Sequence, residues 1–232
     1  MATGHTLKAF DEDLGQLRAL ISEMGGRAEA AIMGSLEALI KRDLDSAARI
    51  VDEDRKIDEL EAEIERRVVR LIALRAPMAD DLREVLAALK IAGVVERMGD
   101  YAKNIAKRVP TLTEARGMEA MSVLPAMGKI VTEMVRSVLD AFVARDPQAA
   151  VAVAARDRAV DDFYNSLFRT LLTHMMENPQ NITASTHMLF IAKNLERIGD
   201  HATNVAEMVY FAATGQQMPE RPKGVDPLAG SA

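Results

Sequence analysis

The chain carries one helical pattern twice, and this repetition restricts it to folds built from two equivalent helical units. Residues 89–109, LKIAGVVERMGDYAKNIAKRV, match residues 189–209, LFIAKNLERIGDHATNVAEMV, at 11 of 21 positions, with an offset of 100 residues. Upstream, ALIKRD at 38–43 matches AFVARD at 141–146 with an offset of 103 residues. The small difference between the offsets falls between the second and third predicted helices of each copy, where a loop can absorb it. We therefore interpret the sequence as an internal duplication.

Apolar residues recur at alternating intervals of three and four, which predicts long amphipathic helices. Asp43 is placed to cap the second helix, Gly215 is placed to end the last one, and prolines break the pattern elsewhere. The pattern predicts three helices in each copy, with these approximate bounds: 7–42, 45–75 and 77–109 in the first, and 124–145, 147–178 and 180–214 in the second.

The expected fold is all-α, with six long helices forming two tandem, pseudo-symmetric three-helix bundles. Aromatic residues make up only 4% of the chain and Trp is absent, a composition that favours helix packing over strand pairing. We predict a first repeat at 5–112, a linker near 111–118, a second repeat at 118–215 and a disordered tail at 216–232.

Charge and composition exclude several classes of protein. The net charge of −6 disfavours binding to nucleic acid and suits cations or basic protein surfaces. Cysteine is absent, so disulfides and thiolate metal sites are excluded. The sequence has neither a signal-peptide pattern nor an apolar run long enough to cross a membrane, so we expect a cytoplasmic protein.

An acidic face is the strongest candidate for a functional site. Glu96, Asp100 and Asn104 are spaced by four residues, as are Glu196, Asp200 and Asn204 in the second copy, so each set lines one side of a helix. The apolar residues of the same helices cluster on nearly the opposite side, which predicts an exposed acidic surface. The second helix of each copy adds Asp54 and Asp58, or Asp157 and Asp161. Side-by-side packing of the two helices would gather four carboxylates in each unit.

Two interpretations of this face stay open. Oxygen ligands of this kind suit hard cations such as Mg, Mn or Ca, and also iron, whereas the scarcity of histidine makes zinc less favoured. Alternatively, the carboxylates are solvated or paired with basic residues near in sequence: Arg55, Arg97, Lys103 and Lys107. Repetition of the same residues favours the metal, although common origin would also preserve them.

No pattern in the sequence predicts catalysis. The chain has no glycine-rich phosphate loop, its four histidines form no spaced cluster, and no serine stands in a nucleophile motif. We therefore expect a protein that is not an enzyme, with no catalytic residues. Gly99 and Gly199 lie in mid-helix, where glycine costs about 1 kcal/mol relative to alanine, so we expect close helix packing at both.

The sequence resembles the PhoU family of phosphate-signalling regulators. The matching segments are ERMGDYAKNIAKR, NLERIGDHATNVAE, DRKIDELE, RDRAVDDF and RAPMADDLREVLAALKI, and the resemblance covers about residues 5–215. One departure concerns Glu61 and Glu65, because Tyr164 and Phe168 stand at the equivalent positions of the second copy. The two acidic sites are therefore expected to differ.

The resemblance implies a negative regulator of phosphate uptake and of the phosphate regulon. Its implied partners are the ATPase subunit of the phosphate transporter and the regulon's sensor histidine kinase, with membrane contact only through these partners. It also implies surface metal ions held by Glu96/Asp100, Glu196/Asp200, Asp54/Asp58 and Asp157/Asp161, with Asn104 and Asn204 as further ligands. We expect a homodimer that binds iron, manganese or magnesium. The alternative is a metal-free helical dimerisation or scaffold protein.

Overall fold

The computed structural model describes residues 2–113 and 123–219, and all regular structure in these two ranges is helical. The expected all-α fold class is thereby confirmed. The elements are α1 (Ala2–Lys41), α2 (Leu44–Glu53), α3 (Arg55–Arg75), α4 (Asp80–Ala106), α5 (Val109–Thr113), α6 (Leu124–Ala144), α7 (Pro147–Glu177), a 3₁₀ turn (Pro179–Asn181) and α8 (Ile182–Thr214).

Helix ends follow the predicted capping residues closely. The Asp43 carboxylate accepts a hydrogen bond from the backbone N–H of Ser46 at 2.9 Å, at the start of α2. Asp146 caps α7 in the same way by accepting from the backbone of Gln148. Gly215 ends α8 with φ at +71°, a left-handed conformation that glycine adopts without steric cost. Local chemistry therefore sets these boundaries.

Two predicted helices differ from the observed ones. The second predicted helix is divided into α2 and α3 at Asp54, which keeps helical dihedral angles (φ −53°, ψ −36°), so the chain bends there and does not turn. The third ends at Ala106, and Pro110 lies within the short α5 and does not terminate the long helix. Most of the predicted linker and tail lies outside the described residues.

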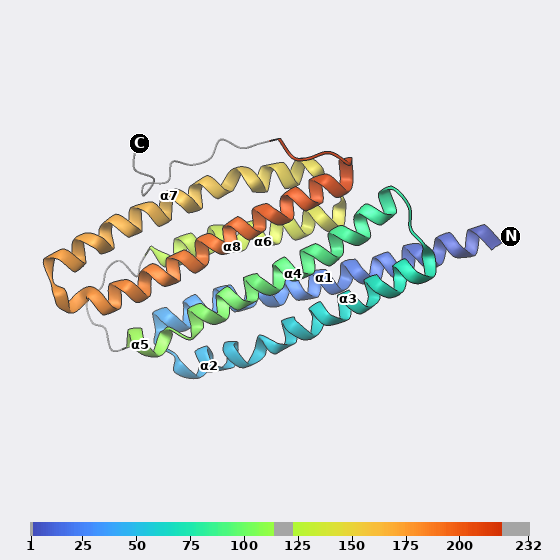
Figure 1. Ribbon diagram of the computed structural model, residues 1–232. Coiled ribbons are helices and arrows are strands. Elements are labelled where there is room, and N and C mark those ends of the chain that lie inside the picture. The colour runs from blue at the N-terminus through green and yellow to red at the C-terminus, as the bar shows by residue number, and fades with distance from the viewer. Residues whose placement is uncertain (1, 114–122, 220–232) are drawn as a thin grey trace.

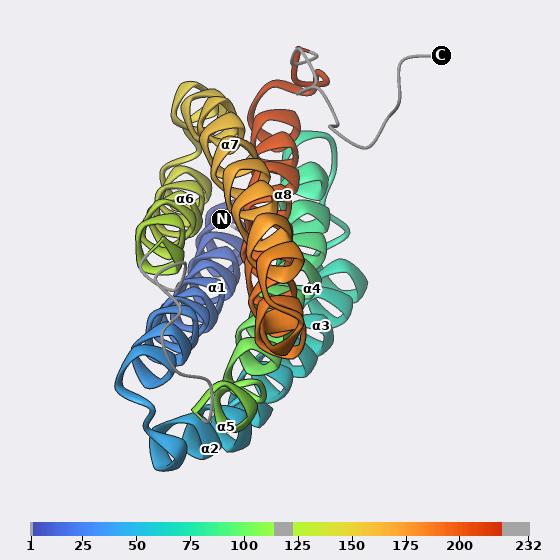
Figure 2. The same cartoon turned by 90° about the vertical axis from the view of Figure 1, so that its left-hand side faces the viewer.

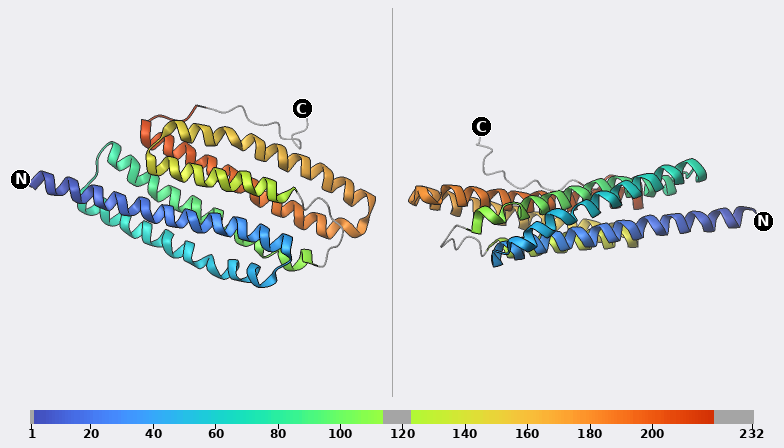
Figure 3. Two further views of the ribbon diagram at one scale, coloured as in Figure 1. Left: turned by 180° about the vertical axis from the view of Figure 1, so that it is seen from behind. Right: turned by 90° about the horizontal axis from the view of Figure 1, so that it is seen from below.

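The long helices form two layers. Contacts join α3 to α4, α4 to α8 and α8 to α7, so these four helices make one curved layer in that order. α1 and α6 lie side by side and cover one face of it, as the end-on view and the view from below show (Figures 2 and 3). The two copies correspond to α1–α4 and α6–α8, related by the pairing of α4 with α8 (Figure 1). We call the opposite face of the four-helix layer, which neither α1 nor α6 covers, the open face.

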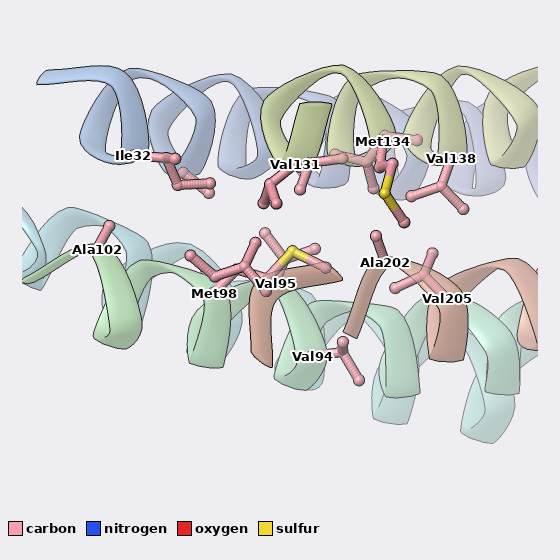
Figure 4. Close-up of a cluster of buried hydrophobic side chains, with 14 of the residues drawn as sticks. Ile32, Val94, Val95, Met98, Ala102, Val131, Met134, Val138, Ala202 and Val205 are labelled. Atoms are coloured by element: carbon pink, nitrogen blue, oxygen red, sulfur yellow. The ribbon is translucent and has the colours of Figure 1, made fainter. Parts of the chain in front are cut away.

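One hydrophobic core fills the space between the layers. Ile32 of α1 and Met134 of α6 face Met98 of α4 and Ala202 of α8, and all four side chains are fully buried (Figure 4). Both copies contribute to this continuous core. The repeat boundaries at 5–112 and 118–215 stay a prediction.

Candidate functional site

The repeated acidic motif lies where neighbouring helices approach each other closely. A Cβ atom added at Gly99 would lie 2.7 Å from Ile57 Cδ1 and 3.4 Å from Asp54 Oδ1 on the neighbouring helix. A Cβ atom added at Gly199 would lie 3.3 Å from both Asp157 Oδ1 and Val160 Cγ1 of α7. The expected close packing at the glycines is confirmed. Its consequence is that each motif lies directly beside an aspartate of the preceding helix.

The first acidic cluster lies between α3 and α4. We define it by its five carboxylates: Asp54, Asp58, Glu61, Glu96 and Asp100. Burial raises the pKa of Asp58, and the Asp54 and Asp100 carboxylates add to the rise. Asp54, Asp58 and Asp100 therefore lie close enough for their charges to affect one another.

Glu96 is the most perturbed carboxylate of the first cluster. Burial, and after it the charges of Asp100, Glu61 and Asp58, raise its pKa to about 7. A carboxyl group with that pKa is partly protonated at neutral pH, because losing the proton adds a charge to an already negative site. The cluster therefore favours the arrival of a proton or another cation.

A lysine supplies one positive charge inside this cluster. Lys103 Nζ donates to Asp100 Oδ1 at 2.5 Å and also donates to Asp54 Oδ2, which joins α4 to the α2–α3 bend. The Asp54 side chain is only 7% exposed, so this ion pair lies in the helix interface. These contacts raise the pKa of Lys103 against the opposing effect of its own burial. Among the four basic residues proposed as partners, Lys103 thus pairs across helices, whereas Arg55 pairs with Glu59 on its own helix.

The second acidic cluster lies between α7 and α8. We define it by Asp157, Asp161, Glu196 and Asp200. Burial raises the pKa of Asp200 to about 6, and the charges of Glu196, Asp157 and Asp161 contribute. Lys193 Nζ donates to Glu196 Oε1 at 2.6 Å, while Glu196 Oε2 is buried without a hydrogen-bond partner within the described part of the chain. The predicted carboxylates of this unit are therefore also brought together.

The predicted acidic surface is only partly exposed: Asp200 and Asn204 are exposed, whereas Asp100 and Asn104 are half-buried. Asp54 and Asp157 are 7% and 8% exposed, and Glu96 and Glu196 are half-buried. The reason is tertiary: the helix that carries each motif packs between two neighbours, so part of its polar side is covered. Asn204 lies 3.4 Å from the His201 ring, and Asn104 makes no described hydrogen bond to the first cluster. Their assignment as additional ligands stays a prediction.

The oxygen donors of the second cluster suit a hard cation better than those of the first. No three Asp, Glu or His side chains of the described residues converge as they do around a bound metal ion. In the second cluster, the partnerless buried oxygen of Glu196 and the raised pKa of Asp200 match an added cation. In the first cluster, Lys103 already forms ion pairs with Asp54 and Asp100. An all-oxygen donor set of this kind suits magnesium or manganese.

A groove runs along the open face over α8, between walls made by α4 and α7. Its lining includes Val94 and Arg97 from α4, Tyr164 and Phe168 from α7, and His201 and Phe211 from α8. All four carboxylates of the second cluster line this groove, and no residue of the first does. The two clusters therefore have different surroundings despite their common motif.

Comparison with known proteins shows that this chain has close relatives. The PhoU domain model matches residues 21–109 and again residues 124–209. The chain is 63% identical over 226 residues to a Zymomonas mobilis protein named phosphate-specific transport system accessory protein PhoU homolog, covering 97% of this chain and 95% of that one. A Caulobacter vibrioides protein of the same name is 50% identical and covers 95% of this chain and 97% of its own.

This chain belongs to the PhoU family. The crystal structure of PhoU from Pseudomonas aeruginosa, at 35% identity, superimposes with a TM-score of 0.86 over 89% of this chain and 100% of that one. The crystal structure of the phosphate transport system regulatory protein PhoU from Streptococcus pneumoniae, at 30% identity, superimposes with a TM-score of 0.85 and covers 91% of this chain and 100% of that one. The family resemblance of the sequence is thereby confirmed. Within the described residues of this PhoU-family chain, no helix is both long and apolar enough to cross a membrane.

The four-residue spacing did not select every residue of the site in this PhoU-family protein. Glu61 joins the first cluster and Lys193 pairs within the second, although neither belongs to the four-residue repeat. Their signal was present in helical spacing, because Glu61 follows Asp58 by three residues and Lys193 precedes Glu196 by three. The Tyr101–His201 contact described below had no such signal, since it joins two helices 100 positions apart.

Proposed function

We propose that this protein is an accessory regulator of phosphate transport that represses phosphate uptake and the phosphate regulon when phosphate is plentiful. It acts by contact with the ATPase subunit of the phosphate transporter and with the sensor histidine kinase of the regulon. The observation that carries the proposal is the family match, which extends over nearly the whole chain to relatives named as transport accessory proteins. No catalytic role is proposed.

The open face is the surface that best suits these contacts. α1 and α6 cover the other face of the four-helix layer, whereas the groove over α8 contains all four carboxylates of the second acidic cluster. A concave surface with apolar and charged residues is typical of sites that bind another molecule. The proposed protein acts in the cytoplasm as a homodimer and reaches the membrane only through its transporter partner.

The metal component of the proposal concerns the two acidic clusters. Glu196, Asp200, Asp157 and Asp161 would hold a hard cation such as Mg²⁺, Mn²⁺ or iron, and the first cluster would hold one with Asp58, Glu96 and Asp100. A bound cation would neutralise the crowded carboxylates and fix their side chains. Its role here is structural and electrostatic, since it would shape the face presented to a partner.

Complementation in the native host tests the regulatory role. In a strain lacking the chromosomal copy, the full chain should restore low expression from a phosphate-starvation promoter when phosphate is abundant. Tagged protein from the same cells should recover the transporter ATPase and the sensor kinase. A chain that is produced at normal levels but restores no repression and recovers neither partner would refute the proposal.

A metal-free scaffold is the second candidate function, favoured by the absence of three converging ligands in the described structure. Metal analysis of protein purified without chelator separates the two. The double variant Asp157→Asn with Asp200→Asn should lose manganese that the unaltered protein retains, whereas Asp45→Asn, in the exposed first turn of α2, should not. Equal absence of metal from all three proteins, with repression intact, would favour the scaffold.

A further inference from the structure

The two acidic clusters differ at one pair of equivalent positions. With the offset of 100 residues that relates the motifs, Lys103 of α4 corresponds to Thr203 of α8. Both residues follow the motif aspartate by three positions, so each lies one turn beyond Asp100 or Asp200. A threonine cannot provide the positive charge that a lysine provides. The two copies therefore present equivalent sites that differ in whether a lysine ammonium group is provided at this position.

Lys103 is held within the first cluster and is not a loose surface charge. Its side chain is 22% exposed, and its ammonium group donates to carboxylates of two different elements, Asp54 at the helix bend and Asp100 on α4. Asp54 is itself buried beside Gly99. The ammonium group thus occupies the space between the two helices where the carboxylates converge.

The lysine of the second cluster is placed differently. Lys193 pairs with Glu196 on its own helix, its side chain is 41% exposed, and its Nζ lies 5.2 Å from the centre of the Tyr164 ring. It approaches the cluster from the edge, one turn before Glu196. Among residues 2–113 and 123–219, the other oxygen of Glu196 has no hydrogen-bond partner. The helix interface of the second cluster receives no lysine from the position equivalent to Lys103.

We propose that Lys103 acts as a tethered cation that closes the first acidic cluster, so that the second cluster binds a divalent cation more tightly. This inference rests on the proposed metal binding of the acidic clusters. A divalent ion entering the first cluster must share or displace an ammonium group that is already bonded to two carboxylates. Repulsion between the divalent ion and the Lys103 ammonium group opposes binding of the ion. Because the ammonium group is covalently attached to the chain, it is always present at the site. In the second cluster the competition is weaker, because the Lys193 ammonium group is bonded to one carboxylate, that of Glu196, and its side chain is more exposed.

A manganese titration followed by NMR separates the two clusters within one molecule. Paramagnetic Mn²⁺ broadens amide signals with a steep dependence on distance. The amides of Ile57 on α3 and Val160 on α7 report on the first and second clusters, because these two helices lie at opposite edges of the four-helix layer. In the unaltered full chain, Val160 should broaden at a Mn²⁺ concentration at least about tenfold lower than Ile57. In Lys103→Thr, which copies the second cluster's residue, the two concentrations should agree within about twofold. Lys107→Thr, at the exposed C-cap position just beyond α4, is the matched control and should behave like the unaltered chain.

Thermal unfolding supplies a second measurement that does not depend on the spectra. With chelator present, Lys103→Thr should unfold at a lower temperature than the unaltered chain, because buried Asp54 loses its partner. Added Mn²⁺ should restore that loss, which shows that the metal replaces the ammonium group. A variant that is destabilised but gains nothing from Mn²⁺ would overturn the inference.

The outcomes distinguish failure of this inference from failure of the metal proposal. Equal broadening of Ile57 and Val160 in the unaltered chain, or earlier broadening of Ile57, would overturn the role of Lys103 and leave metal binding intact. If Mn²⁺ broadens neither amide in the unaltered chain or in Lys103→Thr, metal binding by the clusters fails, and the inference fails with it.

Discussion

Tyr101 and His201 occupy equivalent positions in the two copies of the motif and stack on each other between α4 and α8. Their ring centroids are 5.4 Å apart and their planes meet at 24°. Burial lowers the pKa of His201, and the nearby charges of Arg97 and Arg197 lower it further. The contact therefore joins a phenol ring to a neutral imidazole ring at the centre of the pairing between the two copies.

The first prediction concerns this stack. Tyr101→Leu and His201→Leu should each destabilise the fold, and their effects should be coupled by about 1 kcal/mol in a double-mutant cycle, as expected for a stacked aromatic pair. Urea unfolding at about pH 8, where the imidazole is neutral, provides the four free energies. Strictly additive effects would show that the two rings do not stabilise each other.

The second prediction concerns pH and Glu96. Its folded-state pKa of about 7 lies above the ordinary value of 4.5, so the folded protein holds this proton more tightly than the unfolded chain. The stability it contributes is therefore fully present below about pH 4.5 and is lost as the pH rises through about 7. Glu96→Gln stays uncharged throughout. With chelator present, the free energy of unfolding of Glu96→Gln should exceed that of the unaltered protein by about 1 kcal/mol at about pH 8, after discounting for solvent screening. The difference should vanish near pH 4.

A matched control for that measurement is Glu59→Gln. Glu59 is an exposed residue of α3 whose nearest described cation is Arg55, at 3.6 Å. This variant should follow the pH dependence of the unaltered chain. An equal gain in stability for both variants would show that general loss of negative charge, and not the crowding at Glu96, is responsible.

The third prediction concerns the motif glycines. Gly99→Leu and Gly199→Leu should each lower the free energy of unfolding by about 2 kcal/mol or more, because a side chain at either position meets the facing helix. Gly26→Ala is the control, since a Cβ atom there meets nothing within 4 Å. It should stabilise α1 by up to about 1 kcal/mol through helix propensity. Unchanged thermal stability of both leucine variants would contradict the close approach.

The fourth prediction concerns a buried carboxylate that joins the two copies. Glu84 of α4 is 4% exposed and accepts hydrogen bonds from Arg18 of α1, with Nε at 2.8 Å, while Arg145 at the end of α6 also pairs with it. Glu84→Ala should destabilise the protein by about 3 kcal/mol, because it leaves partly buried guanidinium groups without their partner.

Chemical denaturation of Glu84→Ala beside Glu23→Ala checks this prediction. Glu23 pairs with Arg27 one turn away on the exposed side of α1, where an ion pair contributes little. A similar small loss in both variants would show that the Glu84 contacts do not hold the two copies together.

The sequence alone was sufficient for several features that depend on residues close in the chain. Asp43, Asp146 and Gly215 set helix ends because capping involves only the nearest backbone groups. The Glu96–Asp100 spacing placed both carboxylates on one side of a helix for the same local reason. The break at Asp54 was missed because no proline or glycine marks it, and the bend coincides with packing against other helices.

The helical repeat, its capping residues and the acidic composition of each motif were determined by the sequence itself, because helix periodicity is a local property. The order of α3, α4, α8 and α7 in one layer was decided only by tertiary structure, and with it which side of each motif is covered. The same packing buries Asp54, brings Lys103 to it across 49 positions and stacks Tyr101 on His201. Such contacts depend on which faces of distant helices meet, and periodicity within one helix carries no information about its neighbours.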